Sequence, residues 1–252
     1  GIVACRNKEI MNIFGNAPKF AMLLDPDRVK LNQLEQMVPV CIKNGVDIFL
    51  IGSSLILESE FDLFCQNVKI LAKDVPVIIF PGNGSQVSSH VDGILLLSLL
   101  SGRNPDYLIG QHVLAAGKIK KSGIKVISTA YLLIESGITT AVEFISNTKP
   151  IPAHKPDLVV AHALAAEQLG FSCIYLEAGS GAKFPVSEVI IKSVKKYVSL
   201  PIIVGGGIKT AIDASKAVAA GASCIVCGTL FEDENYQSQI IKEMAIAIKG
   251  EL

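Results

Sequence analysis

Eight short apolar runs, rich in β-branched residues, recur along the chain and constrain its fold more than any other feature. They lack the polar alternation of a half-buried strand, so we expect parallel strands that are buried on both faces. The expected strands are Phe20–Leu24, Asp47–Ile51, Pro76–Phe80, Gly93–Leu97, Lys125–Thr129, Cys173–Leu176, Ile202–Val204 and Cys224–Val226.

Most of the stretches between these runs carry apolar residues at helical spacing. The expected helices are Leu31–Asn44, Leu158–Leu169, Val186–Tyr197, Thr210–Ala220 and Ile240–Ile248. A strand-then-helix rhythm repeated eight times predicts an α/β protein with a (β/α)8 TIM-barrel fold. The rival fold is a doubly wound open sheet, but glycines clustered after the last three strands favour the barrel.

The chain has 252 residues, which suits one barrel, and we interpret residues 1–252 as a single domain. The stretch 139–170 is longer than the other connections and contains Pro150, Pro152 and Pro156. We expect it to form a loop followed by the helix that precedes the sixth strand.

The charge is balanced, with 23 Lys and Arg against 23 Asp and Glu, so no nucleic-acid partner is expected. No run approaches the roughly 18 apolar residues of a membrane span, and we see no signal-peptide pattern. We therefore expect a reduced, cytoplasmic protein, although a transient membrane contact stays open. Cys224 and Cys227 are three apart on an expected strand, which favours two buried cysteines over a metal-chelating pair.

The carboxyl ends of barrel strands carry the active site, so the residues that follow each run are the candidates. Asp25-Pro26-Asp27-Arg28 follows the first run, and Ser53 follows the second. Oxygen ligands of this kind suit Mg2+. The alternatives are a turn with a helix-capping Asp at position 25 and a helix N-cap at Ser53.

Glycines and one carboxylate follow the last three expected strands. The sixth is followed by Glu177 and a Gly-Ser-Gly turn, the seventh by Gly205–Gly207 and the eighth by Gly228 and Thr229. Glycines let backbone N–H groups approach an anion closely, and phosphate sites recur after strands seven and eight of this fold. Glu177 could act as a base, although a flexible turn with a charged end is the alternative.

Taken together, these motifs resemble the geranylgeranylglyceryl phosphate synthase family, including its bacterial heptaprenylglyceryl phosphate synthase-like relatives. The resemblance spans nearly the whole chain, and the Tyr-Leu-Glu run with its Gly-Ser-Gly is its most specific part. The matching segments are Leu24-Asp-Pro-Asp-Arg28, Ile51-Gly-Ser-Ser54, Phe80-Pro-Gly82, Ser101-Gly-Arg-Asn-Pro105, Ala130-Tyr-Leu-Leu-Ile-Glu-Ser-Gly137, Tyr175-Leu-Glu-Ala-Gly-Ser-Gly181, Val204-Gly-Gly-Gly-Ile-Lys209 and Gly228-Thr229.

The resemblance implies transfer of a prenyl group from geranylgeranyl diphosphate to the C3 hydroxyl of sn-glycerol 1-phosphate, with release of diphosphate. It implies that Asp25 and Ser53 hold Mg2+ and that Glu177 is the catalytic residue, which takes the hydroxyl proton. The implied contacts to glycerol phosphate are Tyr175, Leu176, Glu177, Ala178, Gly179, Ser180, Gly181, Gly205, Gly206, Gly207, Gly228 and Thr229. Relatives associate, so a homo-oligomer is expected, with apolar positions around Gly93–Tyr107 as the interface.

The chain departs from the family pattern at two positions. Leu23 stands where some relatives carry a basic residue, so Arg28 could serve the diphosphate instead, and Thr229 stands where Asn is common. The competing interpretation is another phosphate-binding barrel enzyme, such as a sugar-phosphate isomerase. A Schiff-base aldolase is disfavoured, because Lys125 lies at the start of its expected strand.

Overall fold

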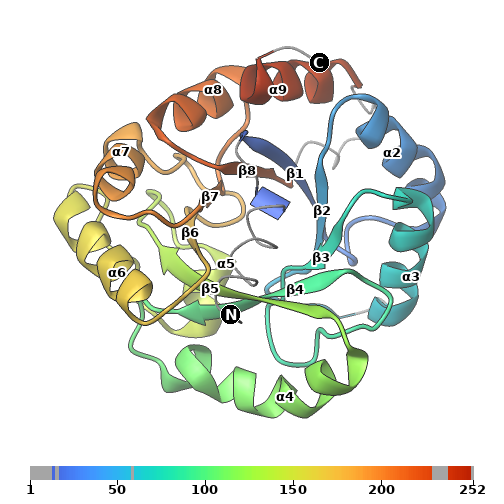
Figure 1. Cartoon of the computed structure of the whole chain (residues 1–252), viewed down its shortest axis with the longest axis horizontal. Coiled ribbons are helices and arrows are strands. Elements are labelled where there is room, and N and C mark those ends of the chain that lie inside the picture. The colour runs from blue at the N-terminus through green and yellow to red at the C-terminus, as the bar shows by residue number, and fades with distance from the viewer. Residues whose placement is uncertain (1–12, 15–16, 58–59, 229–237, 251–252) are drawn as a thin grey trace, which may run out of the picture.

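The computed structural model describes residues 13–14, 17–57, 60–228 and 238–250, and it shows a closed barrel of eight parallel strands (Figure 1). Every strand pairs with its neighbour in the chain, and β8 pairs with β1 to close the sheet. The predicted TIM-barrel fold is therefore confirmed. The strands are β1 (Lys19–Leu24), β2 (Ile48–Ile51), β3 (Val77–Ile79), β4 (Gly93–Leu99), β5 (Lys125–Leu133), β6 (Cys173–Glu177), β7 (Ile202–Gly205) and β8 (Cys224–Cys227).

Helices surround the barrel, and the five predicted ones are confirmed, with each end within two residues of its expected position. The helical elements are α2 (Leu31–Lys43), α3 (Phe61–Ala72), η1 (Asp106–Gly110, a π-helix), α4 (Gln111–Ser122), α5 (Ala141–Ser146), α6 (Pro156–Gln168), α7 (Glu188–Tyr197), α8 (Ala211–Ala220) and α9 (Ser238–Lys249).

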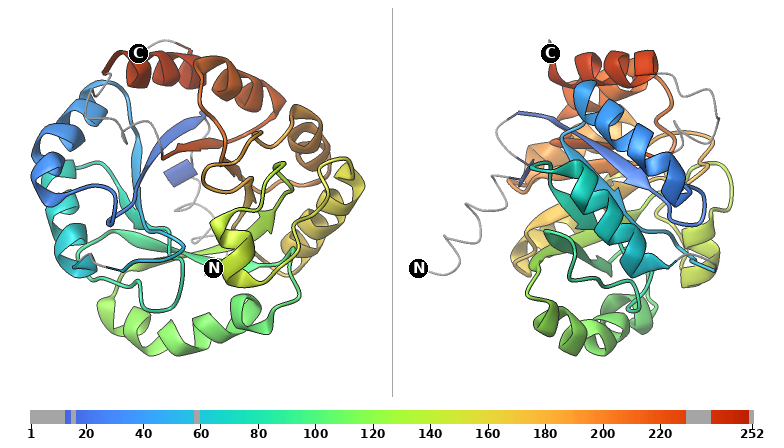
Figure 2. Two further views of the ribbon diagram at one scale, coloured as in Figure 1. Left: turned by 180° about the vertical axis from the view of Figure 1, so that it is seen from behind. Right: turned by 90° about the vertical axis from the view of Figure 1, so that its right-hand side faces the viewer.

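The helices named from the sequence did not include α3, η1 and α4, and two further elements differ from the prediction. The fifth strand was expected to end at Thr129 but continues to Leu133, because its last residues still pair with β6, Tyr131 lying opposite Tyr175. The stretch expected to be a plain loop contains α5, which ends at Asn147 in a left-handed conformation with φ of 49°. In the right-hand view of Figure 2, α5 (yellow-green) lies at the right-hand end of the barrel.

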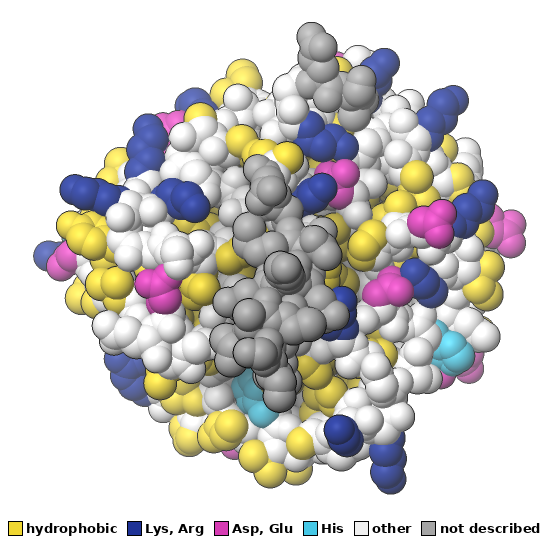
Figure 3. All heavy atoms as spheres, viewed as in Figure 1, with side chains coloured by type: hydrophobic (Ala, Val, Ile, Leu, Met, Phe, Trp, Pro, Cys, Tyr) yellow, Lys and Arg dark blue, Asp and Glu magenta, His cyan; other side chains and the backbone are white. Residues whose placement is uncertain are grey.

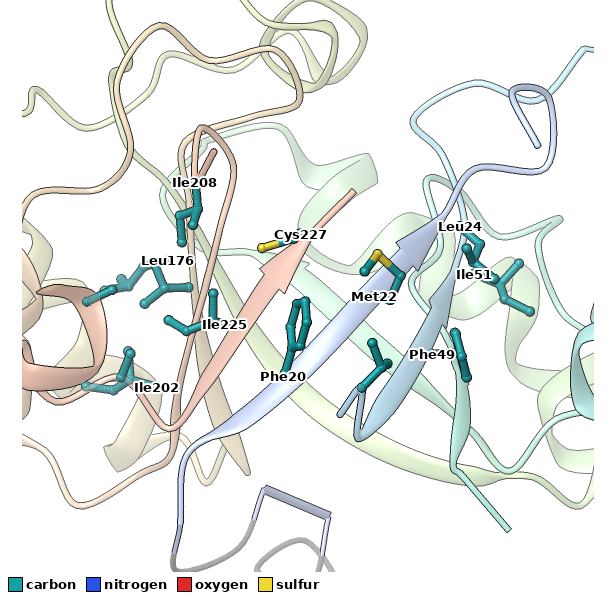
Figure 4. Close-up of a cluster of buried hydrophobic side chains, with 14 of the residues drawn as sticks. Phe20, Met22, Leu24, Phe49, Ile51, Leu176, Ile202, Ile208, Ile225 and Cys227 are labelled. Atoms are coloured by element: carbon teal, nitrogen blue, oxygen red, sulfur yellow. The ribbon is translucent and has the colours of Figure 1, made fainter. Parts of the chain in front are cut away.

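Strand side chains alternate between two buried clusters, as expected for a barrel with helices outside it. Phe20, Met22 and Leu24 of β1 point outward into the layer between strands and helices (Figure 4). Ala21, between them in sequence, points into the barrel.

Cys224 and Cys227 follow the same alternation. Cys224 belongs to the cluster inside the barrel and Cys227 to the outer cluster. Burial raises the pKa of the Cys227 thiol to about 12, so it stays protonated and does not favour a metal. The prediction of two buried strand cysteines is confirmed.

The described surface bears on two further expectations. None of the described helices has the length and apolar character needed to cross a membrane. Basic and acidic side chains are interspersed on the face shown in Figure 3.

The expectation of exposed apolar side chains within Gly93–Tyr107 is wrong, because the large apolar side chains there are buried or half-buried. Exposed apolar side chains begin instead at Ile109 and continue with Val113 and Leu114.

Candidate active site

A cavity of about 450 Å3 opens at the carboxyl ends of the strands, where the fold predicts the active site. Its wall combines strand-end loops with the inward faces of α4 and α5. The predicted site residues that line it are Asp25, Ser53, Tyr175, Glu177, Ser180, Gly181, Gly206, Gly207 and Gly228. One cavity thus brings together most of the candidates that the sequence indicates.

Glu177 is the last residue of β6, and its carboxylate is held from two sides. Its side chain is 5% exposed. The backbone N–H of Gly179 donates to Oε1 at 2.7 Å, and the Tyr131 hydroxyl donates to Oε2 at 3.2 Å. These bonds fix the carboxylate in the floor of the cavity and leave no freedom for it to turn toward bulk water.

Burial sets the proton affinity of Glu177. Desolvation raises the pKa of its carboxyl to about 7, while hydrogen bonds from Gly179, Tyr131 and Tyr175 act in the opposite direction. Desolvation is the larger effect, because loss of water penalises the charged form more than these donors stabilise it. A carboxylate with a pKa near neutrality is well matched to accept a proton during catalysis.

Three aromatic rings pack against one another in the cavity wall, and two of them, Tyr131 and Tyr175, bond to the Glu177 carboxylate. Phe80 stacks on Tyr175 with ring centroids 5.0 Å apart and planes 5° from parallel. Tyr131 is tilted against Tyr175 at 5.4 Å and against Phe80 at 6.0 Å. Sequence reasoning assigned no role to Phe80 or Tyr131. Tyr131 could have been found from strand register, because it lies opposite Tyr175 in the barrel. That inference requires β5 to extend beyond Thr129.

The glycines after β7 have a function that the sequence did not predict. A Cβ on Gly205 would lie 2.3 Å from the Tyr175 hydroxyl oxygen, and one on Gly206 would lie 2.4 Å from Oε1 of Glu177. Gly206 also has φ of +82°, which favours glycine. These two residues therefore make room for the side chains of the site, in addition to any contact with an anion.

Some predicted contacts lie away from the cavity. The side chains of Leu176 and Ala178 point into the outer cluster, because alternate residues of a strand face opposite ways. They are therefore left out of the substrate contacts proposed below. Gly179 uses its backbone N–H to hold Glu177. Thr229 lies outside the described residues, so its predicted contact stays a prediction.

Asp25 and Ser53 lie side by side at the ends of β1 and β2. The Ser53 hydroxyl donates to Oδ2 of Asp25 at 2.9 Å, and the backbone N–H of Asp27 donates to Oδ1 at 3.0 Å. Nε of Arg28 lies 3.6 Å from Oδ2 of Asp25. Among the described residues, no group of three or more His, Cys, Asp or Glu could hold a metal by itself. A carboxylate beside a hydroxyl nevertheless fits Mg2+, which keeps waters and takes further oxygens from a substrate phosphate.

Leu23, where some relatives carry a basic residue, lies on the cavity wall beside the end of β8. A Cβ on Gly228 would lie 3.5 Å from its Cδ2 atom. An apolar side chain therefore lies between β1 and Gly228, so Leu23 supplies no charge to an anion there.

Comparison with known proteins gives sequence relatives that share most of the chain. Residues 15–248 match the family model described as the PcrB family. A geranylgeranylglyceryl phosphate synthase from Chitinophaga pinensis is 47% identical over 229 residues, which cover 91% of this chain and 89% of the relative. One from Methanothermobacter marburgensis is 39% identical over 233 residues, which cover 92% of this chain and 94% of the relative.

Solved structures give the same picture. The (S)-3-O-geranylgeranylglyceryl phosphate synthase from Thermoplasma acidophilum, in complex with its substrate sn-glycerol-1-phosphate, superposes with a TM-score of 0.88. It is 29% identical, and the match covers 97% of this chain and 98% of that one. A thiamine phosphate pyrophosphorylase from Pyrococcus furiosus, 12% identical with a TM-score of 0.58, shares the fold alone.

Proposed function

Because this chain belongs to the PcrB family, we propose that it transfers a prenyl group from geranylgeranyl diphosphate to the C3 hydroxyl of sn-glycerol 1-phosphate. The observation that carries the proposal is the buried Glu177 carboxylate, whose pKa is raised to about 7 in a cavity shared with the glycine loops and Asp25. A base, a phosphate cradle and oxygen ligands for a cation in one cavity suit a reaction of two phosphorylated substrates.

The reaction balances with Glu177 as the proton acceptor. The C3 oxygen of the glycerol forms a bond to the allylic C1 carbon, and the bond between that carbon and the diphosphate oxygen breaks. The hydroxyl proton passes to the Glu177 carboxylate, and pyrophosphate leaves. Because Gly179 and Tyr131 fix both carboxylate oxygens, the base needs little rearrangement to meet the hydroxyl.

The glycine turns after β6, β7 and β8 are the proposed site for glycerol phosphate. Ser180, Gly181, Gly206, Gly207 and Gly228 all line the cavity. The solved relative from Thermoplasma acidophilum binds sn-glycerol-1-phosphate, which supports this choice of acceptor substrate. Backbone N–H groups can neutralise a phosphate locally, so the balanced net charge of the chain is no obstacle.

Asp25 and Ser53 would hold Mg2+, which would neutralise charge on the departing diphosphate when bound. Their hydrogen bond already places the two oxygen ligands 2.9 Å apart. Phe80, Tyr131 and Tyr175 line the same cavity. Aromatic faces favour nearby positive charge, and the allylic carbon gains such charge as the diphosphate departs.

The apolar part of the cavity favours a prenyl donor over a sugar phosphate. Val87, Ile94, Leu96, Ala115 and Ile119 line it between the sheet and α4. A sugar-phosphate isomerase has no use for such a wall, whereas an isoprenoid chain gains free energy from each apolar contact. The alternative of an isomerase is therefore disfavoured.

Product formation tests the proposal directly. The protein is incubated with sn-glycerol 1-phosphate, Mg2+ and a panel of prenyl diphosphates, and ether-linked product is sought by mass spectrometry. We expect product and pyrophosphate in equal amounts, with the geranylgeranyl donor among those used. The enantiomer sn-glycerol 3-phosphate is the control. Absence of product from folded protein with every donor would contradict the proposal.

Self-association is also part of the proposal. Ile109, Val113 and Leu114 expose apolar side chains on adjacent turns of η1 and α4, the kind of surface that monomers rarely leave open. We propose that the homo-oligomer forms through this surface rather than through the region around Gly93–Tyr107.

A further inference from the structure

The buried side chain of Gln86 bonds to the backbone of the loop that follows β2. This residue belongs to the loop after β3, 33 positions further along the chain, and is only 2% exposed. A buried primary amide is costly unless its donors and acceptor are satisfied. The Gln86 amide bonds to the backbone of Ser53, in the loop after β2, and of Gly82, in its own loop.

Gln86 forms both of its bonds to Ser53 with the backbone. Its Nε2 donates to the Ser53 carbonyl oxygen at 2.8 Å, and its Oε1 accepts from the Ser53 N–H at 3.4 Å. Ser53 lies beyond the last residue of β2, Ile51, so no neighbouring strand pairs with it. The Gln86 amide bonds to the Ser53 N–H and carbonyl as a neighbouring strand would. These bonds fix the Ser53 backbone and with it the position of the Ser53 hydroxyl.

The same amide ties the two loops together. Oε1 of Gln86 also accepts from the Gly82 N–H at 3.0 Å. The loops touch so closely that a Cβ on Gly82 would lie 2.0 Å from the Ser53 carbonyl oxygen, and one on Gly52 would lie 1.8 Å from the Phe80 carbonyl oxygen. Only glycine fits at these contacts. Gln86 therefore joins the loops after β2 and β3, and this close contact leaves the Ser53 backbone little freedom to shift.

The consequence reaches Asp25. With its backbone fixed, Ser53 directs its hydroxyl to Oδ2 of Asp25 at 2.9 Å, and this carboxylate also accepts from the Asp27 N–H. We propose that Gln86 is a positioning residue that holds Ser53, and through it Asp25, in place for the diphosphate and its cation. The inference rests on the proposed function, because that function gives Asp25 and Ser53 their ligand.

The chain offers a matched control in Gln111. Its Oε1 accepts from the N–H of Gly84 at 2.7 Å, so it holds the same loop after β3 by the same kind of bond. No bond links Gln111 to Ser53 among those of the described residues. Gln111→Met therefore removes a glutamine hydrogen bond to that loop and leaves the bonds between Gln86 and Ser53 intact.

The experiment measures binding as well as turnover. Calorimetry gives the Kd of inorganic pyrophosphate in excess Mg2+, and separately the Kd of sn-glycerol 1-phosphate, for wild type, Gln86→Met and Gln111→Met. We expect Gln86→Met to weaken pyrophosphate binding about tenfold or more, as loss of the bonds to Ser53 would. It should leave the glycerol phosphate Kd within about twofold. Because Gln111 also lines the cavity, Gln111→Met is compared by the ratio of its two Kd values, which should stay within about twofold of the wild-type ratio.

A second variant covers the case in which Gln86→Met does not fold. Gln86→Glu keeps the acceptor for the N–H groups of Gly82 and Ser53 but loses the donor to the Ser53 carbonyl, so it should also weaken pyrophosphate binding selectively. Unchanged pyrophosphate affinity, or equal weakening of both ligands, in folded variants of an active wild type would overturn the role of Gln86 and leave the proposed function standing. A wild type that forms no ether product would overturn both.

Discussion

Glu177 combines burial with two kinds of hydrogen-bond donor, backbone N–H groups and tyrosine hydroxyls, and the balance between burial and these donors determines its proton affinity. Burial raises the pKa of this carboxyl from 4.5 to about 7, despite the donors around it. A rise of this size corresponds to about 3 kcal/mol against the charged form. The carboxylate is therefore a stronger base than an exposed glutamate and is still largely ionised slightly above neutrality.

The pH dependence of turnover follows from this pKa. A base must be deprotonated, so kcat/KM for sn-glycerol 1-phosphate should fall about tenfold per pH unit below about 7 and level off above it. The glycerol phosphate titrates as well, so the control is Tyr131→Phe. That variant loses a donor to the charged form, which should move the apparent pKa upward while the substrate stays the same. A flat profile between about pH 5 and 8, or identical profiles for the two proteins, would argue against Glu177 as the base.

At the scale of elements, the loop after β7 is shaped by the residues it accommodates. Gly206 has a positive φ and lies where a Cβ would come within 2.4 Å of Oε1 of Glu177 and 2.5 Å of the Gly179 nitrogen. An alanine there must displace the Glu177 carboxylate or the backbone that supports it.

Gly206→Ala should therefore abolish most turnover, by about 100-fold or more, because small displacements of a catalytic group are costly. Gly170→Ala is the matched control. Gly170 has the same φ of +82°, but a Cβ there meets nothing within 4 Å. Both variants should lose about 1 kcal/mol or more of stability from backbone strain, whereas only Gly206→Ala should lose activity. Equal kcat values for the two variants, measured on folded protein, would show that the space beside Glu177 is not critical.

Prediction from sequence succeeded for the helices with a clear apolar period and for the apolar cores of the strands, but it missed α5 and the end of β5. Helices such as α2 and α7 repeat their apolar positions over several turns, which fixes their limits well. The six residues of α5 complete fewer than two turns, so no period can be recognised. The sequence did not predict the end of β5, because Thr129 interrupts the apolar run. In the structure, pairing with β6 extends β5 beyond Thr129.

The candidate site likewise contains residues that the sequence predicted and residues that it did not. Glu177, Asp25 and Ser53 were found because strand ends in a barrel converge on one face. Tyr131 and Gln86 were not assigned a role, because their contacts join residues 46 and 33 positions apart. Such contacts depend on strand register and on how two loops close against each other, which a local pattern does not record.

At the scale of the whole molecule, barrel closure brings distant parts of the chain to one opening. Because β8 pairs with β1, the loops that carry Gly228 and Asp25 become neighbours despite lying at opposite ends of the sequence. The cavity thus combines a polar rim with an apolar wall that continues toward α4. This arrangement suits two phosphorylated substrates, one of which carries a long hydrocarbon chain, as the proposed transfer requires.

The most direct test of this account is the Glu177→Gln variant, measured for binding and for turnover. Gln is similar in size and can still accept from the Gly179 N–H, so the fold and the Kd for sn-glycerol 1-phosphate should stay close to wild type. Ether product from sn-glycerol 1-phosphate and geranylgeranyl diphosphate should fall by about 100-fold or more, because no base remains to take the hydroxyl proton. Wild-type turnover in this folded variant would contradict the central role of Glu177.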